Sequence, residues 1–524
     1  MIRGCYYRYR IVNTNITDLP LCRDPLQDLL RDVSLLKQRI LSETLKEIAD
    51  LPLDGTSREH LCSVMNLMNY VIMRREDLRA LQERLATAGL SSLGRGESHV
   101  LANINRVIDT LSRAVLPESS RVAGAANPGR CETGHHLLGQ RARKLFGELP
   151  AERSEYIMVT MPTEAASDFT LVDNLIAAGM DTARINCAHD DASVWSGMIE
   201  NIRDAARFRQ KECHILMDLG GHKIRTLDVV TRKDAAGKAK TKPPRIYSNE
   251  WLVLSAEHGT PELYENLFDA PVKVVVTCTC PDIIDRLCAQ DTMWIDDGKI
   301  GAVIREKRGN AALLQVNRIG PKGARIKEEK GLNFPETRLN LSSLSEKDLK
   351  DLEFVSRHAD MVGLSFTEQA ADVLKLQEQL SRHGAEGLPV IAKIETAHAV
   401  SRLPDIIARS LARNIDLGIL IARGDLAIEL GSVRMAEIQE EILWLCEAAH
   451  VPVIWATQVL ESLAKKGVAS RPEITDAAMA VRAECVMLNK GPYILNAVSI
   501  LSDVLQRMEA HQYKKVSLLR ALHW

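Results

Sequence analysis

The chain has 524 residues, of which 67 are Lys or Arg and 69 are Asp or Glu, and its formal net charge is -2 at pH 7. This balance excludes a basic field across the whole molecule that would bind nucleic acid or an anionic membrane, and leaves only a local basic cleft open. The length allows two to four domains with well-buried cores.

Cysteine usage and the N-terminal residues indicate a cytoplasmic protein. The 11 cysteines contain no CxxC pair, and Cys278-Thr-Cys280 has the wrong spacing for a zinc knuckle. No apolar run approaches the roughly 20 residues that a membrane helix needs. Residues 1–10 contain basic and aromatic residues but no hydrophobic signal core, and a transit peptide is the alternative there. We therefore expect a reduced protein in the cytoplasm, with neither membrane nor nucleic acid as a partner.

The first 145 residues predict an all-helical domain. Apolar side chains recur there at intervals of three and four, which is the period of an amphipathic helix. These side chains form three series: Leu29, Val33, Leu36 and Ile40; Leu61, Met65, Met68 and Ile72; and Val100, Ile104, Val107 and Leu111. Turn-rich segments at 51–57, 89–97 and 123–134 separate the helices and lead into the next domain.

From residue 156 onward, short apolar strands alternate with amphipathic helical stretches. The expected strands are 156–161, 183–186, 214–219, 360–365, 389–394, 417–422, 451–456 and 484–488. Eight strands with helical crossovers favour a (β/α)8 TIM barrel, formed by residues 150–226 and 334–524, over an open doubly wound sheet. The fold class is therefore α/β.

The long gap between the third and fourth strands predicts an inserted β-rich domain at 227–333. It is rich in Val, Thr and Ile and contains turn signals such as Asp296-Asp-Gly298 and Gly320-Pro-Lys-Gly323. An insertion in a loop that follows a barrel strand lies over the C-terminal face of the barrel, where TIM-barrel enzymes have their active sites. A lid role is therefore expected for it.

Polar residues follow the expected strands at one rim of the barrel. Lys393-Ile-Glu395 and Ala422-Arg-Gly-Asp425 place one lysine and two carboxylates at neighbouring strand ends, which predicts a Mg2+ site beside a cation. The alternative is a surface pair of Lys393 with Glu395 and a helix cap at Asp425. Further rim residues are Arg184, Asn186, Asp218, Lys223 and Thr457. Taken singly, Arg184 is also typical of a helix cap or a surface partner. Asp218 alone is typical of a supporting hydrogen-bonding residue, and Thr457 of an N-cap.

Eight stretches resemble the pyruvate kinase family, in the same order along the chain. They are Ala183-Arg-Ile-Asn-Cys-Ala-His189, Met217-Asp-Leu-Gly-Gly-His-Lys-Ile-Arg-Thr226, Trp294-Ile-Asp-Asp-Gly298, Lys330-Gly-Leu-Asn-Phe-Pro335, Asp360-Met-Val-Gly-Leu-Ser-Phe366, Lys393-Ile-Glu395, Ala422-Arg-Gly-Asp-Leu426 and Ala456-Thr-Gln-Val-Leu-Glu-Ser462. The resemblance implies the glycolytic transfer of a phosphoryl group from phosphoenolpyruvate to ADP, which gives pyruvate and ATP. The family's barrel with an inserted β domain agrees with the architecture expected above.

The resemblance also implies a role for each matched position. Glu395 and Asp425 would bind Mg2+, or Mn2+ in its place, and Lys393 would stabilise the enolate and the moving phosphoryl group. The expected substrate and proton contacts come from Arg184, Asn186, Lys393, Thr457 and the backbone N–H groups of Gly424 and Asp425. The expected nucleotide contacts come from His189, Arg225 and Lys330, and Arg225 would also support the phosphate clamp of Arg184.

Two departures from the family pattern concern K+ and the last barrel loop. Ala188 and Leu219 stand where the family has a serine and a threonine that bind K+, and Lys223 replaces a glutamate. Lys223 would therefore act with Asp218 as a replacement for the potassium site, so K+ is not required. The shortened segment Asn489-Lys-Gly-Pro-Tyr493 replaces Ser-Gly-Glu-Thr-Ala, which predicts altered nucleotide handling.

The resemblance also covers the regulation and the assembly of the protein. The family's C-terminal regulatory domain has no counterpart before Trp524, so we expect no sugar-phosphate regulation and a homo-oligomer that uses other interfaces. The helical region would supply such an interface, cover the barrel bottom, or serve as a passive appendage. Two alternatives stay open: a pseudoenzyme that binds phosphoenolpyruvate or nucleotide, and a Mg-dependent lyase that cleaves a C–C bond next to a 2-oxoacid carboxylate.

Overall fold

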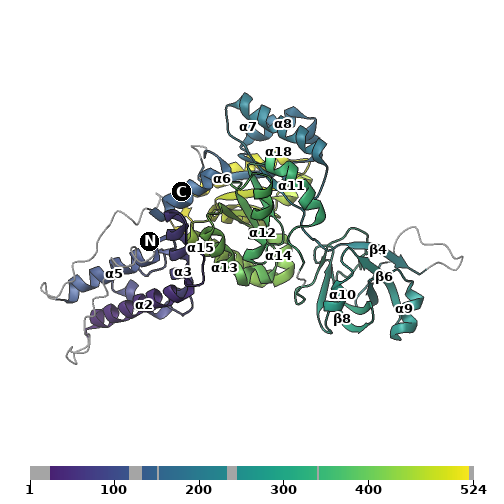
Figure 1. The fold of residues 1–524 in the computed structure, drawn as a ribbon, viewed down its shortest axis with the longest axis horizontal. Coiled ribbons are helices and arrows are strands. Elements are labelled where there is room, and N and C mark those ends of the chain that lie inside the picture. The colour runs from purple at the N-terminus through teal and green to yellow at the C-terminus, as the bar shows by residue number, and fades with distance from the viewer. Residues whose placement is uncertain (1–23, 117–132, 150–152, 233–244, 339–340, 518–524) are drawn as a thin grey trace. The chain divides into compact units, whose positions relative to one another are not determined.

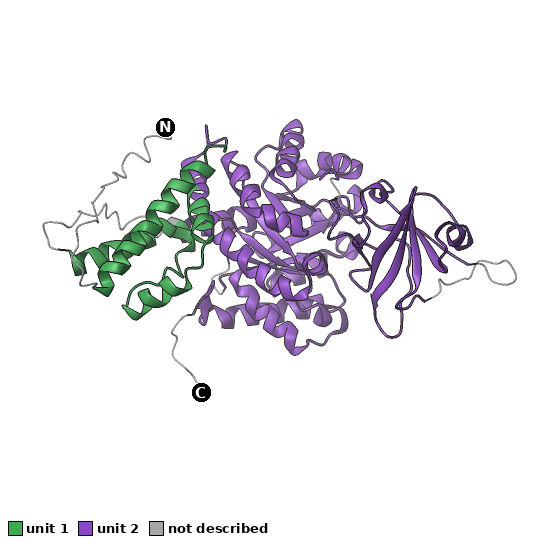
Figure 2. Ribbon diagram, turned by 90° about the horizontal axis from the view of Figure 1, so that it is seen from below, with its two compact units in different colours: residues 1–51, 65–134 green, residues 52–64, 135–524 purple. Residues whose placement is uncertain are grey.

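The computed structural model describes residues 24–116, 133–149, 153–232, 245–338 and 341–517 (Figure 1). The chain divides into two compact units, which are residues 1–51 with 65–134 and residues 52–64 with 135–524 (Figure 2). In the described part of the chain, no helix is both long enough and apolar enough to cross a membrane.

The first unit is helical, as the sequence predicts. Its elements are α2 (Pro25–Glu47), the end of α3 (Arg58–Met73), α4 (Arg79–Thr87), the short helix η1 (Glu97–His99) and α5 (Val100–Val115). Helix α2 begins where Asp24 accepts a hydrogen bond from the N–H of Leu26 and Pro25 supplies a backbone that is already helical. The apolar stripes expected on α2 and α5 are buried.

Eight parallel strands of the second unit form a closed barrel in the order β1-β15-β14-β13-β12-β11-β3-β2. This confirms the predicted fold, and each strand lies within two residues of its expected limits. The strands are β1 (Tyr156–Thr160), β2 (Thr182–Asn186), β3 (His214–Asp218), β11 (Met361–Leu364), β12 (Val390–Ile394), β13 (Leu417–Ala422), β14 (Val453–Ala456) and β15 (Cys485–Leu488). Their nearly continuous burial is typical of a parallel sheet that is covered on both faces.

Helices cover the outside of the barrel, and Figure 1 shows α11 to α15 among them. These elements are η4 (Thr163–Ala166), α7 (Phe169–Ala178), α8 (Ala192–Arg209), α11 (Glu346–His358), α12 (Ala370–Arg382), α13 (Ala397–Ala412), α14 (Arg423–Leu430), α15 (Ser432–Ala449), α16 (Glu461–Lys466), α17 (Arg471–Met479), η5 (Ala480–Arg482) and α18 (Ile494–Glu509). A small hairpin, β16 (Gln512–Tyr513) and β17 (Val516–Ser517), follows α18. Helix α11 begins with a capping box of Ser345 and Asp348.

Helix α6 (Thr133–Phe146) belongs to the barrel unit, although the sequence placed it with the N-terminal helices. Leu145 and Phe146 share a core with inward-facing barrel residues such as Leu216 and Ile391. Gly418 permits this packing, because a Cβ there would lie 3.0 Å from Leu145. The end of α6 therefore packs against the barrel core.

The insertion forms a seven-stranded sheet in the order β10-β7-β8-β9-β5-β6-β4. The elements are β4 (Thr226–Thr231), β5 (Trp251–Ser255), α9 (Pro261–Phe268), β6 (Val272–Cys278), α10 (Ile283–Arg286), β7 (Thr292–Ile295), β8 (Ile300–Arg308), β9 (Ala311–Ile319) and β10 (Leu332–Asn333). Its two connections to the barrel run side by side, because Arg225 pairs with Gly331 and the N–H of Thr226 donates to the carbonyl of Lys330. We call residues 219–226 and 330–333 the stalk.

Candidate functional site

The candidate site lies at the carboxyl ends of the barrel strands. Arg184 and Asn186 end β2, and Asn186 is in register with Asp218 at the end of β3. Lys393 lies near the end of β12, in register with Leu420 of β13. Because parallel strands in register end at one edge, their terminal side chains gather on one face of the barrel.

Asp218 is the centre of a buried ionic network. Its side chain is 1% exposed, and its Oδ2 accepts hydrogen bonds from Nε of Arg184 at 2.8 Å and from Nη2 at 2.5 Å. The ammonium of Lys393 lies 3.3 Å from the same oxygen. Gly363 allows this packing, since a Cβ there would lie 2.6 Å from Oδ1 of Asp218. Nη1 of Arg184 donates to Thr160 at 2.9 Å.

The network fixes the charges of its members. Burial alone would raise the pKa of Asp218, but Lys393 and Arg184 outweigh it and hold this pKa below its ordinary value. Burial acts to lower the pKa of Lys393, and Asp218 and Glu395 reverse that effect and raise it. Lys393 therefore remains a cation inside the barrel rim.

Lys393 also joins the rim to the predicted metal ligand. Its Nζ lies 3.1 Å from Oε1 of Glu395, and the two side chains are 12% and 4% exposed. The pair is thus buried, which excludes the surface-pair alternative. Nζ also donates to Oγ of Ser365 at 2.7 Å, and that hydroxyl donates to the carbonyl of Leu219 at 2.7 Å. The motifs assigned Ser365 no role, although it lies within a stretch that resembles the family.

Glu395 and Asp425 form a carboxylate pair that suits a divalent cation. The pKa of Glu395 is raised, first by burial and then by the charges of Asp425 and Asp218, while Lys393 opposes the shift. Like charges held close together are typical of a cation site, and Mg2+ needs few protein oxygens because it keeps waters and substrate oxygens. Among the described residues, no group of three or more His, Cys, Asp or Glu side chains is placed to hold a metal. Two carboxylates are hard oxygen donors, which suit a Mg2+ ion that completes its coordination with water and substrate oxygens.

Lys223 contacts Asp425. The sequence grouped Lys223 with Asp218, but its Nζ lies 2.7 Å from Oδ1 of Asp425, where the two side chains are 21% and 19% exposed. Asp425 stands in the first turn of α14. A cation of the stalk thus neutralises one of the two carboxylates of the predicted metal site.

Thr457 has a strained backbone. Its φ is 64°, in the left-handed region that costs a β-branched residue free energy and often marks a functional position. It lies outside α16, whose N-cap is Leu460. Its Oγ1 accepts a hydrogen bond from the N–H of Gly424 at 2.7 Å, in the first turn of the neighbouring helix α14. Thr457 is therefore the N-cap of neither helix, because the N-cap of α14 is Ala422.

Arg423 holds Thr457 in this position, a role that the sequence did not reveal. Its guanidinium donates to the carbonyls of Ala456 at 3.1 Å and Thr457 at 2.6 Å, and it pairs with Asp476. It also lies over the ring of Trp455, 4.6 Å from the centroid. These contacts depend on the packing of α14 and α17 around β14, which sequence spacing does not report.

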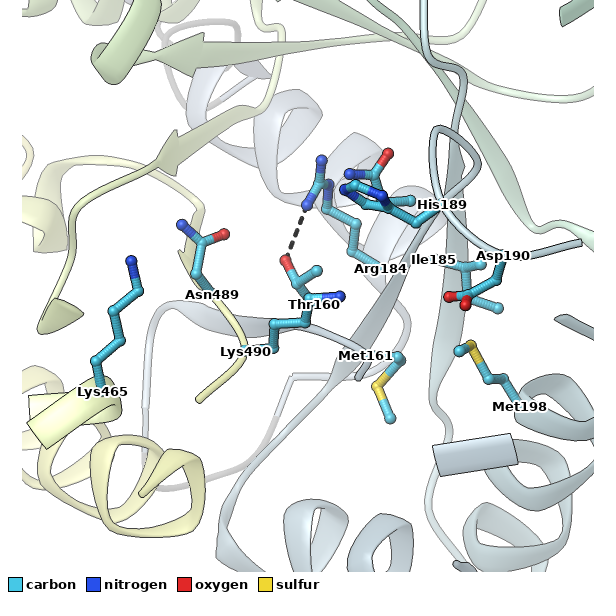
Figure 3. A pocket seen from close by; sticks show the side chains of 11 residues that line it. Thr160, Met161, Arg184, Ile185, His189, Asp190, Met198, Lys465, Asn489 and Lys490 are labelled. Carbon is cyan, nitrogen blue, oxygen red and sulfur yellow. Dashed lines mark hydrogen bonds between the residues drawn. The ribbon is translucent and has the colours of Figure 1, made fainter. Parts of the chain in front are cut away.

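A pocket of about 240 Å³ opens beside Arg184. Figure 3 shows Lys465 and Asn489 on one side of this pocket and His189 on the other, with Lys490 also in its lining. Burial and the nearby charge of Lys490 lower the pKa of His189. Asn186 also lines the pocket. The sequence did not predict a role for Lys465, and it named Lys490 only as part of the shortened segment. The geometry suits an anion with several oxygen atoms.

The other two residues expected to contact nucleotide lie on the stalk. Arg225 donates to the carbonyl of Glu329 at 3.1 Å, and Lys330 lies 3.3 Å from Asp296. Neither side chain lines the pocket beside Arg184. Arg225 still contributes to the lowered pKa of His189, so its charge reaches this side of the barrel.

Comparisons with known proteins agree on one family. The model of the family "Pyruvate kinase, barrel domain" matches residues 152–498. The chain is 30% identical over 365 residues to a pyruvate kinase of Geobacillus stearothermophilus, covering 68% of this chain and 57% of that protein. It is 28% identical over 365 residues to that of Bacillus licheniformis, covering 68% and 58%, and 29% identical over 379 residues to that of Thermotoga maritima, covering 71% and 74%. The crystal structure of a pyruvate kinase from Cryptosporidium parvum matches with a TM-score of 0.59 and 25% identity, covering 70% of this chain and 72% of that one.

Proposed function

Because the chain belongs to the pyruvate kinase family, we propose that it transfers the phosphoryl group of phosphoenolpyruvate to ADP and gives pyruvate and ATP. The observation that carries the proposal is the buried network of Arg184, Asp218, Lys393 and Glu395 with Asp425 beside it. This network presents cations and a carboxylate pair at one rim. Phosphoryl transfer between two anions requires such groups, because they offset the negative charge of the reactants.

Each residue of the network has a defined part in this reaction. An oxygen of the ADP β-phosphate attacks phosphorus, the bond between phosphorus and the enol oxygen breaks, and the electron pair stays on that oxygen as an enolate. Lys393 stabilises this developing charge, and Arg184 binds the phosphate oxygens. Glu395 and Asp425 would hold Mg2+, or Mn2+ in its place, which would supply positive charge to offset the negative charge of the reacting groups.

The end of β14 has a separate part in recognising and completing the product. Thr457 Oγ1 accepts a hydrogen bond from the N–H of Gly424 at 2.7 Å, which leaves the hydroxyl hydrogen of Thr457 to donate to a substrate carboxylate at the start of α14. After phosphoryl transfer, the enolate becomes pyruvate when C3 takes up a proton. Thr457 belongs to the relay that delivers this proton.

The pocket beside Arg184 is the proposed position of the nucleotide phosphates. His189, Lys465 and Lys490 surround it, and Arg225 and Lys330 would approach from the stalk. The shortened segment that starts at Asn489 thus keeps a lysine in the pocket. This favours phosphotransfer over a lyase, which needs no nucleotide.

We also propose that turnover requires no K+. The carboxylate of Asp218 is already neutralised by Arg184 and Lys393, and Lys223 adds a fixed cation at Asp425. An ammonium group can supply the positive charge that a monovalent ion would contribute.

We also expect the protein to be located in the cytoplasm and to form a homo-oligomer.

The test measures pyruvate formed from phosphoenolpyruvate, with and without ADP, Mg2+ and K+. We expect activity that requires ADP and Mg2+, that is unchanged by K+, and that Lys393→Met abolishes. Lys375→Met on α12, where the lysine donates to Ser342 at the surface, is the matched control. Saturable ligand binding without turnover supports the pseudoenzyme, pyruvate release without ADP contradicts phosphotransfer to nucleotide, and rescue by KCl contradicts K+ independence.

A further inference from the structure

The contact between Lys223 and Asp425 couples the stalk of the inserted domain to the metal ligands. Lys223 lies on the loop that leaves β3, and Asp425 lies in the first turn of α14. Their atoms Nζ and Oδ1 are 2.7 Å apart, and about four-fifths of each side chain is shielded from solvent. The two ends of this ion pair belong to elements 202 positions apart in the chain.

The loop that carries Lys223 is held in place by side chains and by close packing. Asp348, at the start of α11, accepts hydrogen bonds from the N–H groups of Gly220 at 3.0 Å and Gly221 at 3.2 Å. Gly221 has a φ of +65°, and a Cβ there would lie 2.8 Å from the side chain of Ser365. These contacts fix the backbone from which Lys223 extends.

The lysine stem is fixed as well. Gly331, on the other connection of the stalk, lies so close that an added Cβ would be 2.9 Å from Cε of Lys223. The aliphatic part of the Lys223 side chain therefore packs against the backbone of Gly331. Because the loop and the stem are both held, the ammonium is directed at Asp425.

The ion pairs of the network balance without a metal. They join three carboxylates and three cations, namely Asp218, Glu395, Asp425, Arg184, Lys393 and Lys223. A divalent cation adds two positive charges to this neutral set and must also share Asp425 with an ammonium. Phosphoenolpyruvate carries a carboxylate and a phosphate, so its arrival supplies the missing negative charge.

We propose that Lys223 competes with the divalent cation for Asp425, so that the protein binds the metal weakly by itself and tightly together with the anionic substrate. This inference rests on the proposed function, because it takes Glu395 and Asp425 as the metal ligands. It assigns Lys223 a role in the order in which the metal and the substrate bind. The residue suppresses occupation of the site by free divalent ions.

The experiment measures Mn2+ binding to the full chain, by the loss of the free-ion signal in electron paramagnetic resonance. It uses the parent protein, Lys223→Met, Lys223→Arg and Lys273→Met, each with and without phosphoenolpyruvate, and needs no turnover. Lys273 is the matched control because it also pairs with a carboxylate, Glu250 at 2.6 Å, within the inserted sheet.

Without phosphoenolpyruvate, we expect Lys223→Met to bind Mn2+ about tenfold more tightly than the parent, since it removes a positive charge next to a ligand. Lys223→Arg and Lys273→Met should match the parent, and phosphoenolpyruvate should improve binding less in Lys223→Met than in the parent. Circular dichroism checks folding, and Lys223→Gln replaces Lys223→Met if that variant is unfolded.

Two results would overturn the inference, and they differ. If the parent and Lys223→Met bind Mn2+ with equal affinity, the metal site stands and the competition by Lys223 is wrong. If no variant binds Mn2+ even with phosphoenolpyruvate, Glu395 and Asp425 are not metal ligands. The proposed function then fails together with the inference.

Discussion

Replacing Asp218 by asparagine is expected to destabilise the barrel unit by about 3–5 kcal/mol, the usual result of removing one partner from a buried ion pair. Asp218 is 1% exposed and its Oδ2 lies 3.3 Å from the ammonium of Lys393. At that distance, with an effective dielectric constant of about 20, the attraction is about 5 kcal/mol. Asparagine has nearly the same shape, so the change removes charge and leaves Arg184 and Lys393 facing a neutral group.

The assay is urea unfolding at pH 7, followed by circular dichroism, with Asp173→Asn as the control. Asp173 makes an aspartate–arginine pair with Arg209 at 2.6 Å, but the two side chains are 14% and 37% exposed. Ion pairs with a solvent-exposed member, such as Arg209, contribute about 0–1 kcal/mol to the free energy of unfolding. A cost for Asp218→Asn that is no larger than that of Asp173→Asn would refute the argument that burial makes this network strong.

The same comparison gives a pH dependence with a defined sign. The pKa of Asp218 lies below its ordinary value in the folded protein, so its contribution is present above the unfolded pKa of about 4 and is lost as the pH falls through the folded pKa. The difference in the free energy of unfolding between the parent and Asp218→Asn should therefore shrink as the solution is acidified below about pH 4. A difference that grows in acid would contradict the assignment.

Three further substitutions test other parts of the barrel. The free energy of unfolding of Thr457→Gly should lie within about 1 kcal/mol of the parent's, because relief of the backbone strain at φ 64° offsets the lost hydrogen bond from Gly424. The rate of pyruvate formation should nevertheless fall at least about tenfold, whereas Thr457→Ser should keep activity. Glu155→Gln should raise the free energy of unfolding at pH 8 by up to about 3 kcal/mol, because burial raises the pKa of Glu155 to about 7. In thermal melts, the stability of the parent should decrease as the pH rises from about 4.5 to 7, and that of the variant should change less. Gly491→Ala should lower the melting temperature, since a Cβ there meets the carbonyl of Ala464, and an unchanged melt would contradict the packing of this loop.

The sequence was sufficient to predict the strands and the rim of the barrel. Runs such as 417–422 are apolar and short, and Arg423 and Asp425 follow this one, so both the strand and the edge at which it ends can be inferred. The same logic placed Lys393 and Glu395 together, and the structure brings them to 3.1 Å.

Contacts between distant segments could not be predicted in this way. The target of Lys223 depends on a loop backbone that Asp348 fixes from α11, and no local pattern connects these residues. The motif Ala422-Arg-Gly-Asp425 assigned Arg423 no role, yet its guanidinium donates to the carbonyl of Thr457. Helix α6 has the same period as the helices before it, and only its packing against the barrel core shows where it belongs.

The order of strands in the barrel also affects how the chain must fold during its synthesis. Strand β1 lies between β2 and β15, so the partner that closes the barrel is made roughly 300 residues later, about 15–60 s at usual translation rates. Until then the growing sheet has open edges, which are templates for pairing with other chains. A ribosome that stalls before Cys485 therefore holds an unclosed sheet, and the protein should depend on chaperones during translation more than its compact barrel suggests.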